Sequence, residues 1–195
     1  MKLDFVSMAA HELRTPLTSL KSNLEVHLRD KALTLADAKT LISLNIDDVN
    51  RLQSLADALL QLTQYQKTNG NLVFEKISIQ EAVREAVRKV QPLARKKHII
   101  LKNNTNDYNV TGNKYGLIDI LVILLDNAVK YSPNNMKVIV EASKSDGYIE
   151  LSVQDFGIGI EIKDIPHIFD RFYRVDSARL NTKAGGYGLG LSIAQ

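Results

Sequence analysis

An imidazole and a carboxylate stand side by side at His11 and Glu12, on a segment whose leucines repeat with the period of an amphipathic helix. Histidine titrates near neutral pH, so its neutral ring keeps a nitrogen that can attack phosphorus. The neighbouring carboxylate could orient the ring or take its proton. The pair suggests phosphate chemistry on histidine, although an isolated His-Glu pair is more often an ordinary solvated surface pair.

Three segments in the second half of the chain carry residues suited to a nucleotide. Asn127, Lys130 and Tyr131 share one helix face and offer an amide oxygen, a cation and a ring. In segment 155–159, two glycines let the backbone approach a flat ligand, and the aspartate can accept a hydrogen bond from an exocyclic amine. Segment 185–191 opens the last predicted helix with glycines, whose free amides suit phosphates. Each of these patterns, taken singly, also occurs in plain turns and helix ends.

The composition excludes several classes of protein. With 195 residues, 45% of them hydrophobic and 24% charged, the chain is an ordinary globular one with one large domain or two small ones. The 25 basic and 22 acidic residues are spread along it, so no nucleic-acid-binding patch is expected. There is no cysteine, which excludes disulfides, thiolate metal sites and cysteine nucleophiles. The most apolar stretch, 117–129, is interrupted by Asp119 and Asp126 and is not expected to cross a membrane.

Two helices must position His11. Leucines at 13, 17, 20, 24 and 28 form a stripe on the first, and Pro16 predicts a bend just after His11. A polar break at 29–34 precedes a second helix with leucines at 41, 44, 52, 55, 59 and 62. A lone hairpin buries too little surface to be stable, so we expect it to pair with a second copy as a four-helix bundle. Packing against the chain's own second domain is the alternative.

The rest of the chain alternates between strand and helix patterns. Polar turn formers at 67–71 mark a domain boundary. The expected elements are a strand at 72–74, a helix at 79–97, a strand at 99–102, a helix at 114–131, and strands at 137–142 and 148–154. This order predicts an α/β sandwich with its helices on one face of a mixed sheet.

With these motifs in order, the chain resembles the sensor histidine kinases of two-component signalling over nearly its whole length. The matching segments are the phosphoacceptor box at 11–16, the N box at 126–131, the first glycine box at 155–159, the F box at 168–176 and the second glycine box at 186–190. The resemblance implies an α+β fold. A helical hairpin at 1–66, a four-helix bundle as dimer, would be joined by a linker at 67–71 to an ATP-binding domain of the histidine kinase, gyrase and Hsp90 type at 72–195.

The resemblance also implies a role for each matching residue. His11 would be phosphorylated, Glu12 would be its base, and Thr15 would hold the water that hydrolyses the phosphorylated partner. Asn127 would bind Mg²⁺. The ATP-binding residues would be Asn127, Lys130, Tyr131, Asp155, Gly157, Gly159, Arg174, Gly186, Gly188 and Gly190.

The activity implied is that of an ATP- and Mg²⁺-dependent autokinase. It would pass the phosphoryl group from His11 to an aspartate of a response regulator and act as a phosphatase toward that regulator. The chain would form a homodimer through residues 1–66, bind no nucleic acid, make no membrane contact, and be the cytoplasmic part of a membrane-anchored protein. A catalytically silent dimerisation and docking module, and an ATPase without a histidine acceptor, are the alternatives.

Three departures from the family pattern carry expectations of their own. Ile123 stands where many relatives have a second asparagine, which predicts weaker metal binding. The chain stops at Gln195, short of the usual last helix and strand, which predicts weaker ATP binding. Tyr187 is interpreted as a tolerated surface substitution.

The charges at 84–97 are interpreted as a solvated helix face. The remaining histidines are interpreted as structural or surface residues: His27, His98 and His167.

Overall fold

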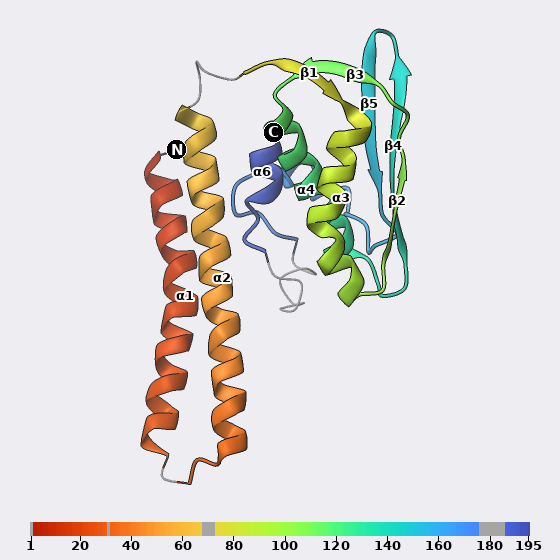
Figure 1. Cartoon of the computed structure of the whole chain (residues 1–195). Helices are drawn as coiled ribbons and strands as arrows, with labels where there is room; N and C mark the ends of the chain where they lie inside the picture. The colour runs from red at the N-terminus through yellow and green to blue at the C-terminus, as the bar shows by residue number, and fades with distance from the viewer. Residues whose placement is uncertain (1, 31, 68–72, 176–185) are drawn as a thin grey trace.

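The computed structural model describes residues 2–30, 32–67, 73–175 and 186–195. It consists of a long helical hairpin, which we call the stem, and an α/β domain beside its upper half (Figure 1). The stem comprises α1 (Lys2–Arg29) and α2 (Leu35–Lys67), which run antiparallel. The expected hairpin is therefore present.

Helix α2 begins with a reciprocal cap. The Thr34 hydroxyl accepts a hydrogen bond from the Asp37 amide at 3.2 Å and donates one to the Asp37 carboxylate at 2.6 Å. This is the capping-box arrangement, which satisfies amides that have no partner inside the helix. The hydrogen bonds from Thr34 lower the pKa of Asp37.

Helix α1 continues through Pro16, and the bend expected just after His11 stays a prediction. Proline removes one backbone donor, but the turns on both sides keep their own bonds and the helix continues. The stem has only part of its leucines inside. Leu55 and Leu62 are buried, whereas Leu17 is 51% and Leu28 is 88% exposed. The stem therefore leaves an apolar surface uncovered within a single chain.

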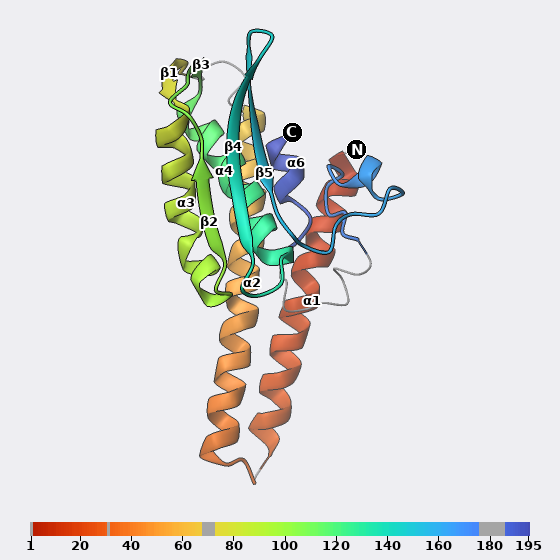
Figure 2. The same ribbon diagram turned by 90° about the vertical axis from the view of Figure 1, so that its right-hand side faces the viewer.

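The α/β domain is built on a mixed sheet. Parallel pairing joins β2 (Ile100–Asn104) to β4 (Lys137–Ser145), and antiparallel pairing joins β4 to β5 (Tyr148–Gln154). A separate antiparallel pair links β1 (Glu75–Ser78) to β3 (Asn109–Gly112). Helices α3 (Ile79–Lys96) and α4 (Lys114–Tyr131) lie on one face of the strands (Figures 1 and 2). The predicted one-sided mixed sheet is confirmed.

The core of this domain lies between that face and the two helices. Both helices start at side-chain caps: Ser78 accepts from the Glu81 amide at 3.3 Å, and Asn113 accepts from the Gly116 amide at 2.7 Å. Helix α4 ends where expected, because Ser132 precedes a proline and adopts an extended conformation. Fully buried side chains from α3, α4 and β4 fill the core, among them Ile79, Val83, Ile118, Leu125, Val129, Val138 and Val140.

Two expectations about strands need correction. The strand expected at 72–74 is wrong for Val73 and Phe74, which lie before β1, and Phe74 is 64% exposed; residue 72 lies outside the described residues. Strand β3 was not predicted at all. Both strands of this pair have four residues, and Ile77 is the only buried side chain of β1, so neither gives a clear alternating pattern. The short elements that follow are the 3₁₀ helix η1 (Ile165–His167) and α6 (Gly190–Ala194).

Candidate functional site

Helix α4 turns one face toward the stem. Residues at intervals of four, four and three lie on that face: Asp119, Ile123, Asn127 and Lys130. At its upper end the side-chain amide of Gln61 in α2 donates to Asp119 Oδ2 at 3.1 Å. In the middle Ile123 packs against α6, where a Cβ added at Gly190 would lie 3.2 Å from its Cγ2 atom. Ile123 thus occupies a packing position between α4 and α6.

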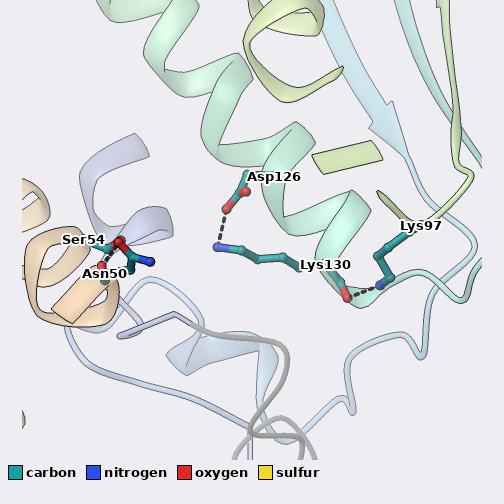
Figure 3. Close-up of polar contacts among 5 residues, drawn as sticks. All are labelled: Asn50, Ser54, Lys97, Asp126 and Lys130. Atoms are coloured by element: carbon teal, nitrogen blue, oxygen red, sulfur yellow. Dashed lines mark hydrogen bonds and ion pairs between the residues drawn. The ribbon is translucent and has the colours of Figure 1, made fainter. Parts of the chain in front are cut away.

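At the lower end of this face, Lys130 Nζ lies 2.5 Å from Asp126 Oδ2. Figure 3 shows both side chains on the side of α4 that faces α2 and α6. The Lys130 and Asp126 side chains are 29% and 34% exposed, and a pair of that exposure contributes little to stability. Lys130 can therefore exchange its partner for a phosphate. Asn127 and Tyr131 are half-buried beside it.

The first glycine segment is seated against the end of α4. Asp155 Oδ1 accepts a hydrogen bond of 2.7 Å from the Gly157 amide, which closes a tight turn. A Cβ added at Gly157 would come within 2.7 Å of the Tyr131 carbonyl oxygen. Only glycine permits this approach. Residues 155–159 and Tyr131, which lie far apart in the sequence, are thereby brought together, with Asp155 exposed.

The second glycine segment is seated against the segment that follows η1. The Phe172 amide donates to the Gly188 carbonyl at 2.9 Å. Gly188 has a φ of +69°, and a Cβ there would collide with the Tyr173 carbonyl oxygen and lie 2.7 Å from the Phe172 carbonyl carbon. Leu189, next along the chain, is buried. Among the described residues, none lies within 4 Å of a Cβ added at Gly186.

The α/β domain contacts the stem through an apolar cluster, which we call the stem contact. Its buried members are Ala9, Leu55, Leu62, Phe172 and Leu189, with Phe5, Leu13, Ala58, Leu59, Tyr187 and Ile193 around them. The Phe5 and Phe172 rings lie 5.9 Å apart, and the Arg171 guanidinium lies 5.2 Å from the Phe5 ring centre. Figure 2 shows this part of the domain beside α1. The part of the stem around Ala9 and Leu55 therefore packs on the second domain of the same chain, which was the alternative to dimerisation.

Tyr187 belongs to the stem contact, so its interpretation as a surface substitution is wrong. Burial raises the pKa of the Tyr187 hydroxyl, and the carboxylates of Glu12 and Asp48 add to the rise, while Arg51 and Arg174 oppose it. The ring therefore lies close to charged groups of both stem helices. A bulky residue inside a glycine segment was the only sequence feature that could have indicated this contact.

His11 lies on α1 outside the stem contact. Phe5, Ala9 and Leu13 repeat every four residues and face the α/β domain, whereas the His11 side chain is exposed. One turn further along, the Thr15 hydroxyl donates to the His11 carbonyl oxygen at 3.2 Å. The imidazole is consequently accessible on the stem, and Glu12 beside it is half-buried.

The residues expected to bind a nucleotide come together from three parts of the chain. Asn127, Lys130 and Tyr131 lie on the last turns of α4, and segment 155–159 packs against its end. Segment 186–190 contacts the middle of α4, where Gly190 lies against Ile123. Arg174 is half-buried near Tyr187. In the part of the chain that the structure describes, no three His, Cys, Asp or Glu side chains form a cluster able to hold a metal ion. A cation at this site would depend on the Asn127 amide together with phosphate and water oxygens.

Lys97 was not predicted to contribute to the site. It was grouped with the solvated charges of 84–97, and that description fits Arg84 and Lys96, which are exposed. Lys97 is half-buried, and its ammonium makes two hydrogen bonds to the last turn of α4 and one to Ser132, which follows it. Its place directly after the last turn of a helix was the available indication, since a lysine there can reach neighbouring carbonyls.

Of the remaining histidines, His27 is half-buried, and His98 and His167 are exposed, which agrees with the expectation of structural or surface residues. His27 Nδ1 lies 2.7 Å from the Asn23 carbonyl oxygen. His98 adopts a φ of 54° in the turn after α3, and His167 Nδ1 lies 2.9 Å from Asp170 Oδ2.

Two family models match the chain in tandem. The His Kinase A (phospho-acceptor) domain matches residues 1–68, and the histidine kinase-, DNA gyrase B- and HSP90-like ATPase matches residues 112–195. The chain belongs to the sensor histidine kinases of two-component systems. In this histidine kinase chain the first match contains α1 with His11 and the second contains α4 with both glycine segments.

Known histidine kinases resemble the chain over most of its length. The signal transduction histidine-protein kinase ArlS of Staphylococcus haemolyticus is 31% identical over 191 residues, which are 98% of this chain and 42% of ArlS. The chain thus spans less than half of that relative. The structure of full-length ShkA in complex with AMPPNP has a TM-score of 0.65 and 25% identity, covering 97% of this chain and 39% of ShkA. Histidine kinase ThkA in complex with response regulator protein TrrA has a TM-score of 0.73 and 23% identity, and the match covers 88% of this chain and 50% of that chain. Across the described residues, no helix of this kinase is both long and apolar enough to span a bilayer.

Proposed function

We propose that the chain is an ATP-dependent autokinase that phosphorylates His11. The observation that carries the proposal is the stem contact, because it joins the helix that bears His11 to the segments that form the candidate nucleotide site. We divide the chain into a phosphotransfer and dimerisation domain at 1–66, a linker at 67–71 and a catalytic domain at 72–195. The tandem order of the two family matches supports this division.

The geometry at Gly157 supports ATP as the ligand. Gly157 packs so closely against the Tyr131 carbonyl that no side chain would fit there. Its backbone lies next to Asp155, whose exposed carboxylate can accept a hydrogen bond from the adenine amine. Lys130 and Arg174 would contact phosphates, Tyr131 would lie against the nucleotide, and backbone would be shaped around it at Gly159, Gly186, Gly188 and Gly190. Asn127 would hold Mg²⁺, whose role is to neutralise phosphate charge.

The chemistry assigned to the stem is an in-line phosphoryl transfer. A ring nitrogen of neutral His11 attacks the γ-phosphorus of ATP, the bond from that phosphorus to the bridging oxygen breaks, and ADP leaves. Glu12 takes the proton that the ring then carries in excess. Positioning and charge neutralisation supply most of the catalysis in such transfers, and the residues named above are suited to both.

Labelling tests this assignment. Incubation with ATP labelled at the γ-phosphate should label the wild type and leave His11→Gln unlabelled, because glutamine has no nucleophilic ring nitrogen. His27→Gln is the matched control, since His27 lies on the same helix and is expected to leave labelling unchanged. Equal labelling of His11→Gln and the wild type would place the acceptor elsewhere.

We infer that the stem also forms a homodimer. Its exposed apolar side chains include Leu17, Leu24, Leu28, Ile42, Leu44 and Val49, each at least 45% exposed in the single chain. A second stem could cover them as a four-helix bundle. Light scattering after gel filtration should give twice the mass of one chain, and a monomer would contradict the inference.

The partner we propose is a response regulator, which would receive the phosphoryl group from His11 on an aspartate. ThkA is seen in complex with such a protein, which supports the proposal by analogy. We also propose a phosphatase activity toward that regulator, with Thr15 holding the water, and a cytoplasmic site of action. Thr15→Ala should lose the phosphatase activity and keep His11 labelling; loss of both would contradict this role.

A further inference from the structure

Lys97 is bonded to the end of the helix that carries the candidate nucleotide residues. It follows α3 directly, and its ammonium donates to the carbonyl oxygens of Val129 at 3.0 Å, Lys130 at 2.8 Å and Ser132 at 2.7 Å. Figure 3 shows the contact with Lys130. An ammonium has three donors, and here all three point at backbone carbonyls of one helix terminus.

These contacts satisfy groups that a helix cannot satisfy itself. The last four carbonyls of an α-helix have no intrahelical partner, and they carry the negative end of the helix dipole. A cation placed among them is therefore favourable both as a hydrogen-bond donor and as a charge. The backbone of Lys97 takes part as well, because its carbonyl accepts from the Asn135 amide at 3.0 Å. Lys97 thus joins the turn after α3 to the turn after α4.

The same helix end is held from a second direction by the first glycine segment. Lys97 binds the carbonyls at 129, 130 and 132, and the remaining carbonyl, that of Tyr131, is the group against which Gly157 is seated. A change in the path of residues 129–132 would move the Tyr131 carbonyl and the seat of Gly157. The same change in backbone path would also turn the Lys130 side chain, because the Lys130 carbonyl is one of the three acceptors of the Lys97 ammonium.

We propose that Lys97 is a positioning residue for nucleotide binding, which fixes the end of α4 so that Lys130, Tyr131 and the Gly157 loop keep a common geometry. The inference rests on the proposed function, since the ligand is ATP. Lys97 lies behind the helix terminus and acts through the backbone of α4. It is therefore expected to change the affinity for ATP and not the chemical step at His11.

The test compares two adjacent lysines. Lys97→Met removes the ammonium and keeps an unbranched side chain, and Lys96→Met is the matched control because Lys96 is exposed at the last position of α3. The rate of His11 labelling is measured as a function of ATP concentration with Mg²⁺ present. Lys97→Met should raise KM for ATP about tenfold, which corresponds to about 1.4 kcal/mol, with kcat within about twofold of wild type. Lys96→Met should leave both constants unchanged.

Lys97→Arg keeps the assay decisive if Lys97→Met unfolds. A guanidinium retains the charge and several donors, so Lys97→Arg should have a KM within about threefold of wild type. Circular dichroism melts of all variants establish which of them are folded. Equal KM values for Lys97→Met and Lys96→Met would overturn the inference. A fall in kcat of Lys97→Met at unchanged KM would also overturn it. So would a KM for Lys97→Arg as high as that of folded Lys97→Met. Absence of ATP binding in the wild type would instead refute the proposed function.

Discussion

Gly188 and Gly159 provide a matched pair for testing how the second glycine segment is held. Both have left-handed backbone, with φ of +69° at Gly188 and +71° at Gly159. They differ in their surroundings, because an added Cβ at Gly159 meets nothing within 4 Å, whereas at Gly188 it meets the backbone of Phe172 and Tyr173. Alanine at both positions therefore separates backbone strain from the close approach.

The expected magnitudes follow from the shared backbone conformation and from the difference in surroundings. A non-glycine residue in left-handed conformation costs about 1–2 kcal/mol, which applies equally to both variants. Forcing an extra methyl group against fixed backbone costs about 1–3 kcal/mol more, which applies to Gly188→Ala alone. Gly159→Ala should thus lose about 1–2 kcal/mol and Gly188→Ala about 2–5 kcal/mol.

Amide hydrogen exchange measures this effect where it arises. The Phe172 amide donates to the Gly188 carbonyl, so its protection reports whether the two segments remain together. Gly188→Ala should reduce that protection by more than about tenfold, the equivalent of about 1.4 kcal/mol, while Gly159→Ala leaves it nearly unchanged. Urea unfolding of both variants gives the corresponding global values. Equal losses of Phe172 protection in the two variants would refute the argument from close approach.

Other regions of the molecule give three further expectations. Leu125→Ala empties a fully buried site between α4 and the sheet and should cost about 2–5 kcal/mol in urea unfolding. The pKa of Asp37 is lowered in the folded stem, so the Asp37 carboxylate stabilises the fold above its ordinary pKa, and this stabilisation is lost as pH falls through the lowered pKa. Asp37→Asn should therefore reduce the fall of the melting temperature at acid pH, which we call the acid limb. Tyr187→Ser should loosen the stem contact and increase the radius of gyration in X-ray scattering, and Tyr187→Phe should not.

Each of these has an outcome that contradicts it. A loss below about 1 kcal/mol for Leu125→Ala would mean that the site collapses without a cavity. An unchanged acid limb in Asp37→Asn would show that the Thr34 cap does not couple to stability. An identical scattering curve for Tyr187→Ser and the wild type would show that the remaining apolar members hold the domain on the stem.

Local patterns predicted the longer elements of the fold. Helix α4 begins at an asparagine cap and ends before Ser132 and Pro133, and these features are encoded within a few residues of each boundary. The hairpin from β4 to β5 was recognised for the same reason. The pair β1 and β3 was not, because each strand is four residues long and depends on a partner about thirty residues away. Pro16 lies inside α1, where the turns on both sides maintain the helix.

The sequence by itself determined which chemistry is available: an exposed imidazole beside a carboxylate, an amide and a cation on one helix face, and glycines where backbone must approach closely. These depend on residue type and short spacing, which the chain order contains. Only the tertiary structure decided that Tyr187 joins the stem contact, that Gly157 is seated on Tyr131, and that Lys97 holds the end of α4. Such contacts join residues tens of positions apart, and close packing, not local propensity, selects them.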